Sequence, residues 1–127
     1  MRTTPQASHT YKQMLISREF SFSAAHNLPS YKGKCERLHG HTYRVRVTVK
    51  GEIGEDGLAF DFVELKEIVE NKVISILDHS YLNEIIPVAS CENIALWIWQ
   101  KLKDVLTLYE VRVWESDDTF VSLRGEE

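Results

Sequence analysis

The chain has little cysteine, no long apolar run and no excess of basic charge. No apolar run approaches the ~20 residues that span a bilayer, so a membrane protein is not expected. The net charge of -4 argues against a general nucleic-acid binder, which would be basic. Residues 1–14 lack the hydrophobic centre of a secretory signal. Cys35 and Cys91 could pair, but this setting favours reduced thiols and a cytoplasmic protein.

What is present is typical of one globular domain. The 127 residues are 43% hydrophobic and 27% charged, enough for a genuine core. The polar start, rich in Thr, Ser and Gln, predicts a loose tail over residues 1–13, followed by a single domain over 14–127.

Hydrophobic periodicity predicts four strands and two helices in the order ββααββ. Strict alternation in Thr42–Lys50 is the clearest strand signal, and an apolar stripe with a repeat near 3.6 follows the capping residue Asp61. The expected elements are strands Leu15–Ala25 and Thr42–Lys50, a helix from Asp61 through Leu77, a helix from Ser90 to about Leu106, and strands Tyr109–Glu115 and Thr119–Arg124. We expect an α+β antiparallel four-stranded sheet with two helices on one face, whose exposed edges favour assembly with further copies.

A His-x-His pair suggests a metal site. His39 and His41 lie on one face if the segment is extended, and Gly40 between them adds no side chain. His26, at the end of the first strand, is the best third ligand. Three protein ligands and an open position are typical of catalytic zinc. The alternative is that His39 and His41 are ordinary surface residues at the start of a strand.

Cys35, four residues before His39, has two possible roles. As a fourth ligand it would close a structural zinc site, and as a free thiol it would be a base or nucleophile. Lys32, Lys34 and Arg37 make its loop basic, which suits either solvation or a phosphate contact.

Two acidic residues, Asp78 and Glu115, each have more than one possible role. Asp78-His79 could form an acid–base pair, but adjacent residues on a regular helix do not face each other, so the pair needs irregular backbone. Otherwise His79 is a histidine at a helix C-terminus. Glu115, on an apolar strand, is either an edge charge or a ligand anchor.

Six segments in order resemble the family of 6-pyruvoyltetrahydropterin and 6-carboxytetrahydropterin synthases. The resemblance covers about Glu19 to Arg124, and its segments are Phe22-Ser-Ala-Ala-His26, Cys35-x-x-Leu-His39-Gly-His41, Asp61-Phe62-x-x-Leu65-Lys66, Leu77-Asp78-His79-x-x-Leu82-Asn83, Ser90-x-Glu92-Asn93 and Glu115. It implies a T-fold that assembles as a homo-oligomer, a hexamer made of two trimers, with sites at subunit interfaces.

The resemblance also implies roles for particular residues. His26, His39 and His41 would bind zinc, and Cys35 would transfer a proton rather than bind the metal. Asp78 and His79 would form a dyad, in some members from a different subunit than the zinc. Substrate contacts would come from Glu115, which anchors the pterin, and from Ser90 and Glu92.

The substrate class implied is 7,8-dihydroneopterin triphosphate. The spacing from Cys35 to His39 resembles the members that form 6-carboxy-5,6,7,8-tetrahydropterin with release of acetaldehyde and triphosphate, toward queuosine and related 7-deazapurines. A related group cleaves the side chain to 6-hydroxymethyl-dihydropterin with a glutamate one position after the cysteine. Since Glu36 stands there, that activity, or both, is the alternative, unless Glu36 only pairs with Lys34 or Arg37. Formation of 6-pyruvoyltetrahydropterin and a pterin-binding protein without turnover also stay open.

Overall fold

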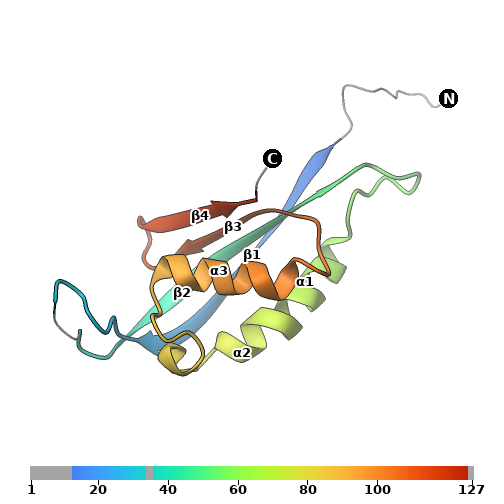
Figure 1. The fold of residues 1–127 in the computed structure, drawn as a ribbon. Coiled ribbons are helices and arrows are strands. Elements are labelled where there is room, and N and C mark those ends of the chain that lie inside the picture. Colours follow the sequence, from blue (N-terminus) through green and yellow to red (C-terminus); the bar gives the residue numbers. More distant parts are fainter. Residues whose placement is uncertain (1–12, 34–35, 126–127) are drawn as a thin grey trace.

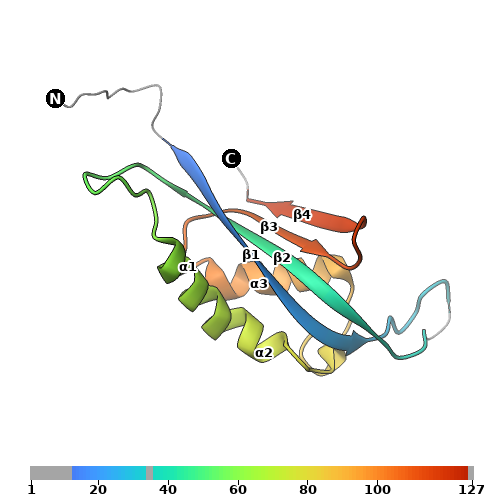
Figure 2. The same ribbon diagram turned by 180° about the vertical axis from the view of Figure 1, so that it is seen from behind.

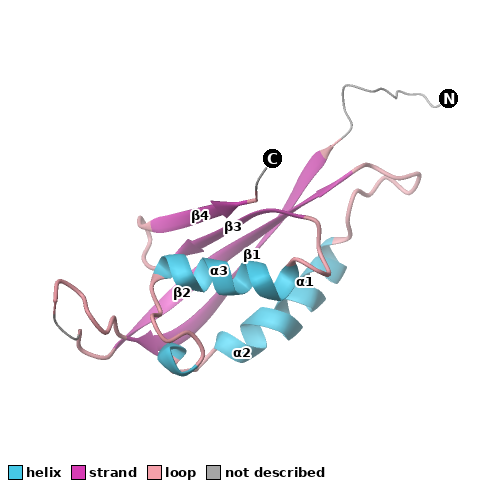
Figure 3. Cartoon of the chain, in the orientation of Figure 1, coloured by secondary structure: helices cyan, strands magenta, loops and turns pink. Residues whose placement is uncertain are grey.

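The structure is a computed structural model that describes residues 13–33 and 36–125. Within this part of the chain, a sheet of four antiparallel strands in the order β1-β2-β3-β4 carries its helices on one face (Figures 1 and 3). The elements are β1 (Met14–His26), β2 (His39–Gly51), α1 (Phe62–Val69), η1 (Glu70–Ile74), α2 (Ser75–Leu77), η2 (Leu82–Glu84), α3 (Cys91–Leu102), β3 (Leu108–Trp114) and β4 (Phe120–Arg124). The predicted fold class and order of elements are confirmed.

β1 and β2 form a long antiparallel hairpin that crosses the whole domain (Figure 2). Its register runs from Met14 opposite Gly51 to His26 opposite His39. Because side chains alternate along a strand, Tyr43 and the apolar residues that follow it at every second position lie on the helix-covered face, fully buried. Arg44 and its alternates lie on the other face. The alternation in the sequence therefore fixes which face holds the core.

The first helical segment is continuous through α1, η1 and α2 and begins at Asp61, whose carboxylate accepts a hydrogen bond from the backbone N–H of Val63. Its buried residues recur every four positions: Leu65, Val69, Val73 and Leu77. An α-helix turns every 3.6 residues, so a repeat of four drifts around it. The wider turn of the π-helix η1 offsets this drift. Phe62 and Ile76, predicted on the same stripe, are instead exposed.

The second helix, α3, is capped by Ser90, as predicted, with the hydroxyl accepting from the backbone N–H of Asn93 at 3.1 Å. It ends at Leu102 rather than near Leu106, and the chain continues as a turn in which the backbone N–H groups of Val105 and Leu106 both donate to the Leu102 carbonyl. No helix in the described ranges is long and apolar enough to cross a membrane.

The outer edge of β1 is covered near its C-terminal end by the segment after α2. Ala25 pairs with Tyr81 in an isolated parallel bridge, and its N–H donates to the Ser80 carbonyl at 3.0 Å. The N–H of His79 donates to the Ser23 carbonyl at 2.6 Å. This edge contact brings residues 78–81 beside the strand end that carries His26.

Candidate metal and substrate site

Three histidines meet where the β1–β2 hairpin opens. His26 ends β1, His39 begins β2 directly opposite, and His41 follows two residues later on the same face. Their ligand nitrogens all lie within 4.8 Å of one another, and His26 is 1% exposed. The antiparallel register alone therefore brings together the residues that the sequence predicted as metal ligands.

Two backbone carbonyls fix how these imidazoles are protonated. His26 Nδ1 lies 2.7 Å from the Ala89 carbonyl oxygen, and His39 Nδ1 lies 2.8 Å from that of Arg37. A carbonyl oxygen can only accept, so each Nδ1 carries the proton and each Nε2 presents a lone pair. These two Nε2 atoms are 3.1 Å apart. At this separation the two Nε2 atoms need a metal ion or a proton between them, and carbonyl-held imidazoles are the usual surroundings of a bound metal ion.

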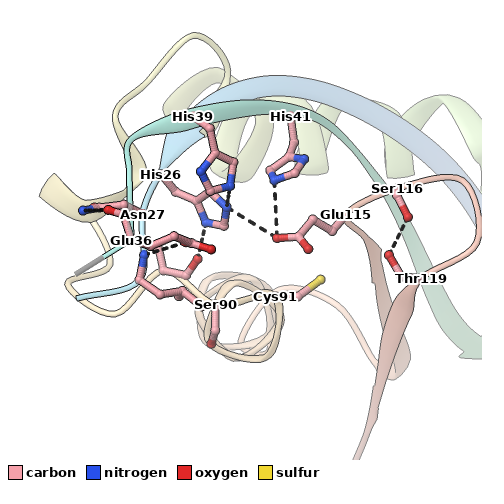
Figure 4. A network of polar contacts seen from close by, with 12 residues as sticks. His26, Asn27, Glu36, His39, His41, Ser90, Cys91, Glu115, Ser116 and Thr119 are labelled. Carbon is pink, nitrogen blue, oxygen red and sulfur yellow. Dashed lines mark hydrogen bonds and ion pairs between the residues drawn. The ribbon is translucent and has the colours of Figure 1, made fainter. Parts of the chain in front are cut away.

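A carboxylate completes the cluster. Glu115 follows the end of β3, and its Oε2 lies 3.4 Å from His26 Nε2 and 3.6 Å from His41 Nε2. Figure 4 shows this side chain directed at the imidazoles. Burial lowers the pKa of His41, against the opposing charge of Glu115. A neutral imidazole is the form that binds metal.

Asp78 and His79 contact each other although they are neighbours in the chain. His79 has a φ of 61°, in the left-handed region, and its Nδ1 lies 3.1 Å from Asp78 Oδ2. This is the irregular backbone that such a pair requires. The backbone N–H of Ser23 donates to Asp78 Oδ1 at 2.9 Å, and this bond, with the nearby His79, lowers the pKa of Asp78.

The Asp78–His79 pair lies at the outer edge of β1. His79 borders a depression of about 510 Å³ whose other lining residues are Ser23, Ala24, Ala25, Gly40, His41, Thr42 and Ser80. The side chains of Ser23 and Thr42 meet there at 3.1 Å, on the face opposite the core. The three histidines share the face of Tyr43, on the helix-covered side. One chain therefore directs the imidazoles of the cluster toward the helix-covered side and holds the Asp78–His79 pair at the edge of β1, and His41 borders the same depression as His79.

The remaining predicted residues lie near the start of α3 and in the β1–β2 loop. The Ser90 hydroxyl is occupied by the helix cap, and Glu92 is exposed in the first turn. Burial raises the pKa of the half-buried Cys91 thiol to about 12. Glu36 bonds to the backbone of Leu28, whereas Cys35 lies outside the described residues.

Two asparagines belong to this region and were not predicted to meet. Asn27 directly follows His26, and Asn83 lies in η2 after the Asp78–His79 pair. The Asn83 side chain bonds to both backbone groups of Asn27. Asn83 belongs to one of the six segments that resemble the family, and the sequence gives no other sign that it contributes to the site.

Comparison with known proteins agrees with this geometry. The profile of the 6-pyruvoyl tetrahydropterin synthase family matches residues 15–126. A 6-carboxy-5,6,7,8-tetrahydropterin synthase of Synechocystis is 43% identical over 111 residues, covering 80% of this chain and 86% of the relative. Human 6-pyruvoyl tetrahydrobiopterin synthase is 38% identical, with 90% and 93% covered. The solved structure of the Caenorhabditis elegans 6-pyruvoyl tetrahydropterin synthase superposes with a TM-score of 0.79 at 31% identity, covering 90% of this chain and 96% of that one. The chain belongs to the 6-pyruvoyl tetrahydropterin synthase family, an enzyme family of tetrahydropterin synthases.

Proposed function

We propose that this chain is a zinc enzyme that converts 7,8-dihydroneopterin triphosphate and water to 6-carboxy-5,6,7,8-tetrahydropterin, acetaldehyde and triphosphate. The convergence of three imidazoles beside Glu115 carries this proposal. The spacing from Cys35 to His39 and the 43% identical 6-carboxy-forming relative favour the carboxy product. The 38% identical human relative keeps the 6-pyruvoyl product as the second candidate.

Each residue then has a role that its place allows. His26, His39 and His41 would hold the zinc, which when bound would polarise the side-chain oxygens of the substrate and acidify the adjacent C–H. Cys35 would accept that proton. Glu115, open to one side of the cluster, would anchor the pterin by accepting hydrogen bonds from its 2-amino and ring N–H groups.

His79, held by Asp78, would manage a second proton. Since Asp78 and His79 are held at the edge of β1 whereas the imidazoles of the cluster share the buried face of Tyr43, we infer that a complete site combines two chains of a homo-oligomer, for which a hexamer made of two trimers is our expectation. The outer edge of β1 is where the second chain would meet His79.

Product analysis tests the activity. The protein, loaded with one zinc per chain, is incubated with dihydroneopterin triphosphate, and the pterins formed are identified by mass. We expect the 6-carboxy product, with none from His39→Ala or from zinc-stripped protein. Full activity in a metal-free preparation would overturn the zinc assignment, and substrate bound but unchanged would indicate a pterin-binding protein.

A mixing experiment tests the shared site. Cys35→Ala and His79→Ala chains are each inactive on this proposal, and they are mixed in equal amounts under conditions that allow subunits to exchange. If each site takes its thiol and its dyad from different chains, random assembly restores about a quarter of the wild-type activity. A site built within one chain would recover none.

A further inference from the structure

The Asn83 side chain bonds to the backbone N–H and carbonyl of Asn27, the residue after His26, in the way that a neighbouring strand would. Its Oδ1 accepts from the Asn27 N–H at 3.0 Å, and its Nδ2 donates to the Asn27 carbonyl at 2.8 Å and to the Pro87 carbonyl at 3.0 Å. β1 has ended by this point, so a side-chain amide replaces the missing strand partner.

These bonds of Asn83, which we call the Asn83 clamp, also constrain the hydrogen bond between His26 and Ala89. Asn83 ties Asn27 to Pro87, and the adjacent His26 donates to Ala89, two residues beyond Pro87. The Asn83 clamp and the His26–Ala89 bond therefore link the same two segments of chain. A shift of one segment along the other would turn the His26 imidazole.

Glu36 forms the same kind of contact with Leu28, the residue that follows Asn27. Its N–H donates to the Leu28 carbonyl at 3.0 Å, and its Oε1 accepts from the Leu28 N–H at 3.0 Å. Its own carbonyl accepts from Asn27 Nδ2 at 3.0 Å. Figure 4 shows Asn27 and Glu36 together on the His26 side of the cluster, away from Glu115. The two ends of the β1–β2 loop are thus closed by side chains as well as by backbone.

We propose that Asn83 and Glu36 are positioning residues, which hold residues 27 and 28 so that the His26 imidazole keeps its place against His39 and His41. This inference rests on the proposed function. It gives the Glu36 carboxylate the task of an acceptor for a backbone N–H, in place of the proton-transferring role that a side-chain-cleaving activity would require. An acceptor needs only an oxygen at the right place, whereas a proton-transferring carboxylate needs its ionisable proton.

Glu36→Gln and Glu36→Ala separate these roles. Gln keeps an Oε1 that can accept from Leu28 but cannot transfer a proton at neutral pH, and Ala removes both functions. We expect Glu36→Ala to lower kcat at least about tenfold with KM changed less than about twofold, because small displacements of reacting groups cost large factors in rate. Glu36→Gln restores most of that loss. If Gln is as inactive as Ala, the carboxylate is a reagent and the proposal is overturned.

Amide hydrogen exchange gives a readout that needs no turnover. In the zinc-loaded protein we expect Glu36→Ala to speed exchange of the Leu28 amide at least about tenfold and Glu36→Gln to leave it protected. Asn83→Ala should likewise speed exchange of the Asn27 amide and should also lower zinc affinity. Glu84→Ala is the matched control, since this exposed carboxylate adjoins Asn83. Unchanged exchange of both amides in the Ala variants would overturn the proposal.

The two proposals fail in different ways. If wild-type protein gives no pterin product, the proposed function fails, while the two amides still show whether the side chains hold the loop. If wild-type protein is active but Asn83→Ala keeps its zinc affinity and kcat, the positioning proposal alone is wrong.

Discussion

Removing single histidines from the cluster should separate metal binding from folding, because the three differ in burial. His26 is 1% exposed and donates to the buried Ala89 carbonyl, whereas His39 is only partly buried and donates to the exposed Arg37 carbonyl. In metal-free protein, His26→Ala leaves a cavity and an unpaired carbonyl, which together cost about 2–4 kcal/mol of unfolding free energy. His39→Ala should cost no more than about 1 kcal/mol.

Zinc should change this order. A ligand that binds only the folded state adds about 4 kcal/mol when its free concentration is a thousand times its Kd. Wild-type protein should gain this stabilisation, and His26→Ala and His39→Ala should both lose most of it, since each removes one of three ligands. With zinc, the wild type should therefore exceed His39→Ala by about 4 kcal/mol, although the two differ little without metal.

The assay is urea unfolding at one chain concentration, with a chelator and with buffered zinc, for the wild type and the two variants. His79→Ala is the control, since its side chain is 83% exposed and pairs with Asp78 rather than with the three histidines, so it should keep the full zinc shift. A His39→Ala variant that also keeps this shift would refute the three-histidine site. Equal losses of unfolding free energy in His26→Ala and His39→Ala without metal would refute the argument from burial.

Three further outcomes follow from the site. Cys35→Ala should keep about one zinc per chain while product formation falls by about two to four orders of magnitude, and loss of zinc measured by atomic absorption would instead make Cys35 a ligand. The pKa of Asp78 is lowered in the folded state, chiefly by the Ser23 N–H, so its stabilisation is present at neutral pH and is lost as the pH falls. The gap in unfolding free energy between wild type and Asp78→Asn should therefore narrow from about pH 7 to about pH 3. Burial raises the pKa of the Cys91 thiol to about 12. In the folded Cys35→Ala variant this thiol should therefore resist iodoacetamide at about pH 8 until urea unfolds the protein, and fast labelling of Cys91 in the folded variant would contradict this.

Much of the fold could be predicted because its signals are local. Alternation in Thr42–Lys50 fixed the buried face of β2, and Asp61 and Ser90 marked helix starts through their own side chains. The helix ends were less readable. The π-helical turn of η1 and the early end of α3 depend on how the helices pack on the sheet, and packing leaves no mark on a single segment.

The site divides along the same line. His26, His39 and His41 could be predicted together because one antiparallel register brings them face to face, and residue types with this spacing already suggest a metal. The loop contacts could not, since Asn83 meets Asn27 across 56 residues of sequence and Glu36 bonds to a main-chain amide that any residue would offer. A side chain that replaces a strand partner has no characteristic spacing. For this reason the sequence suggested a reagent at Glu36, whereas the structure suggests an acceptor, and Glu36→Gln is the substitution that separates the two.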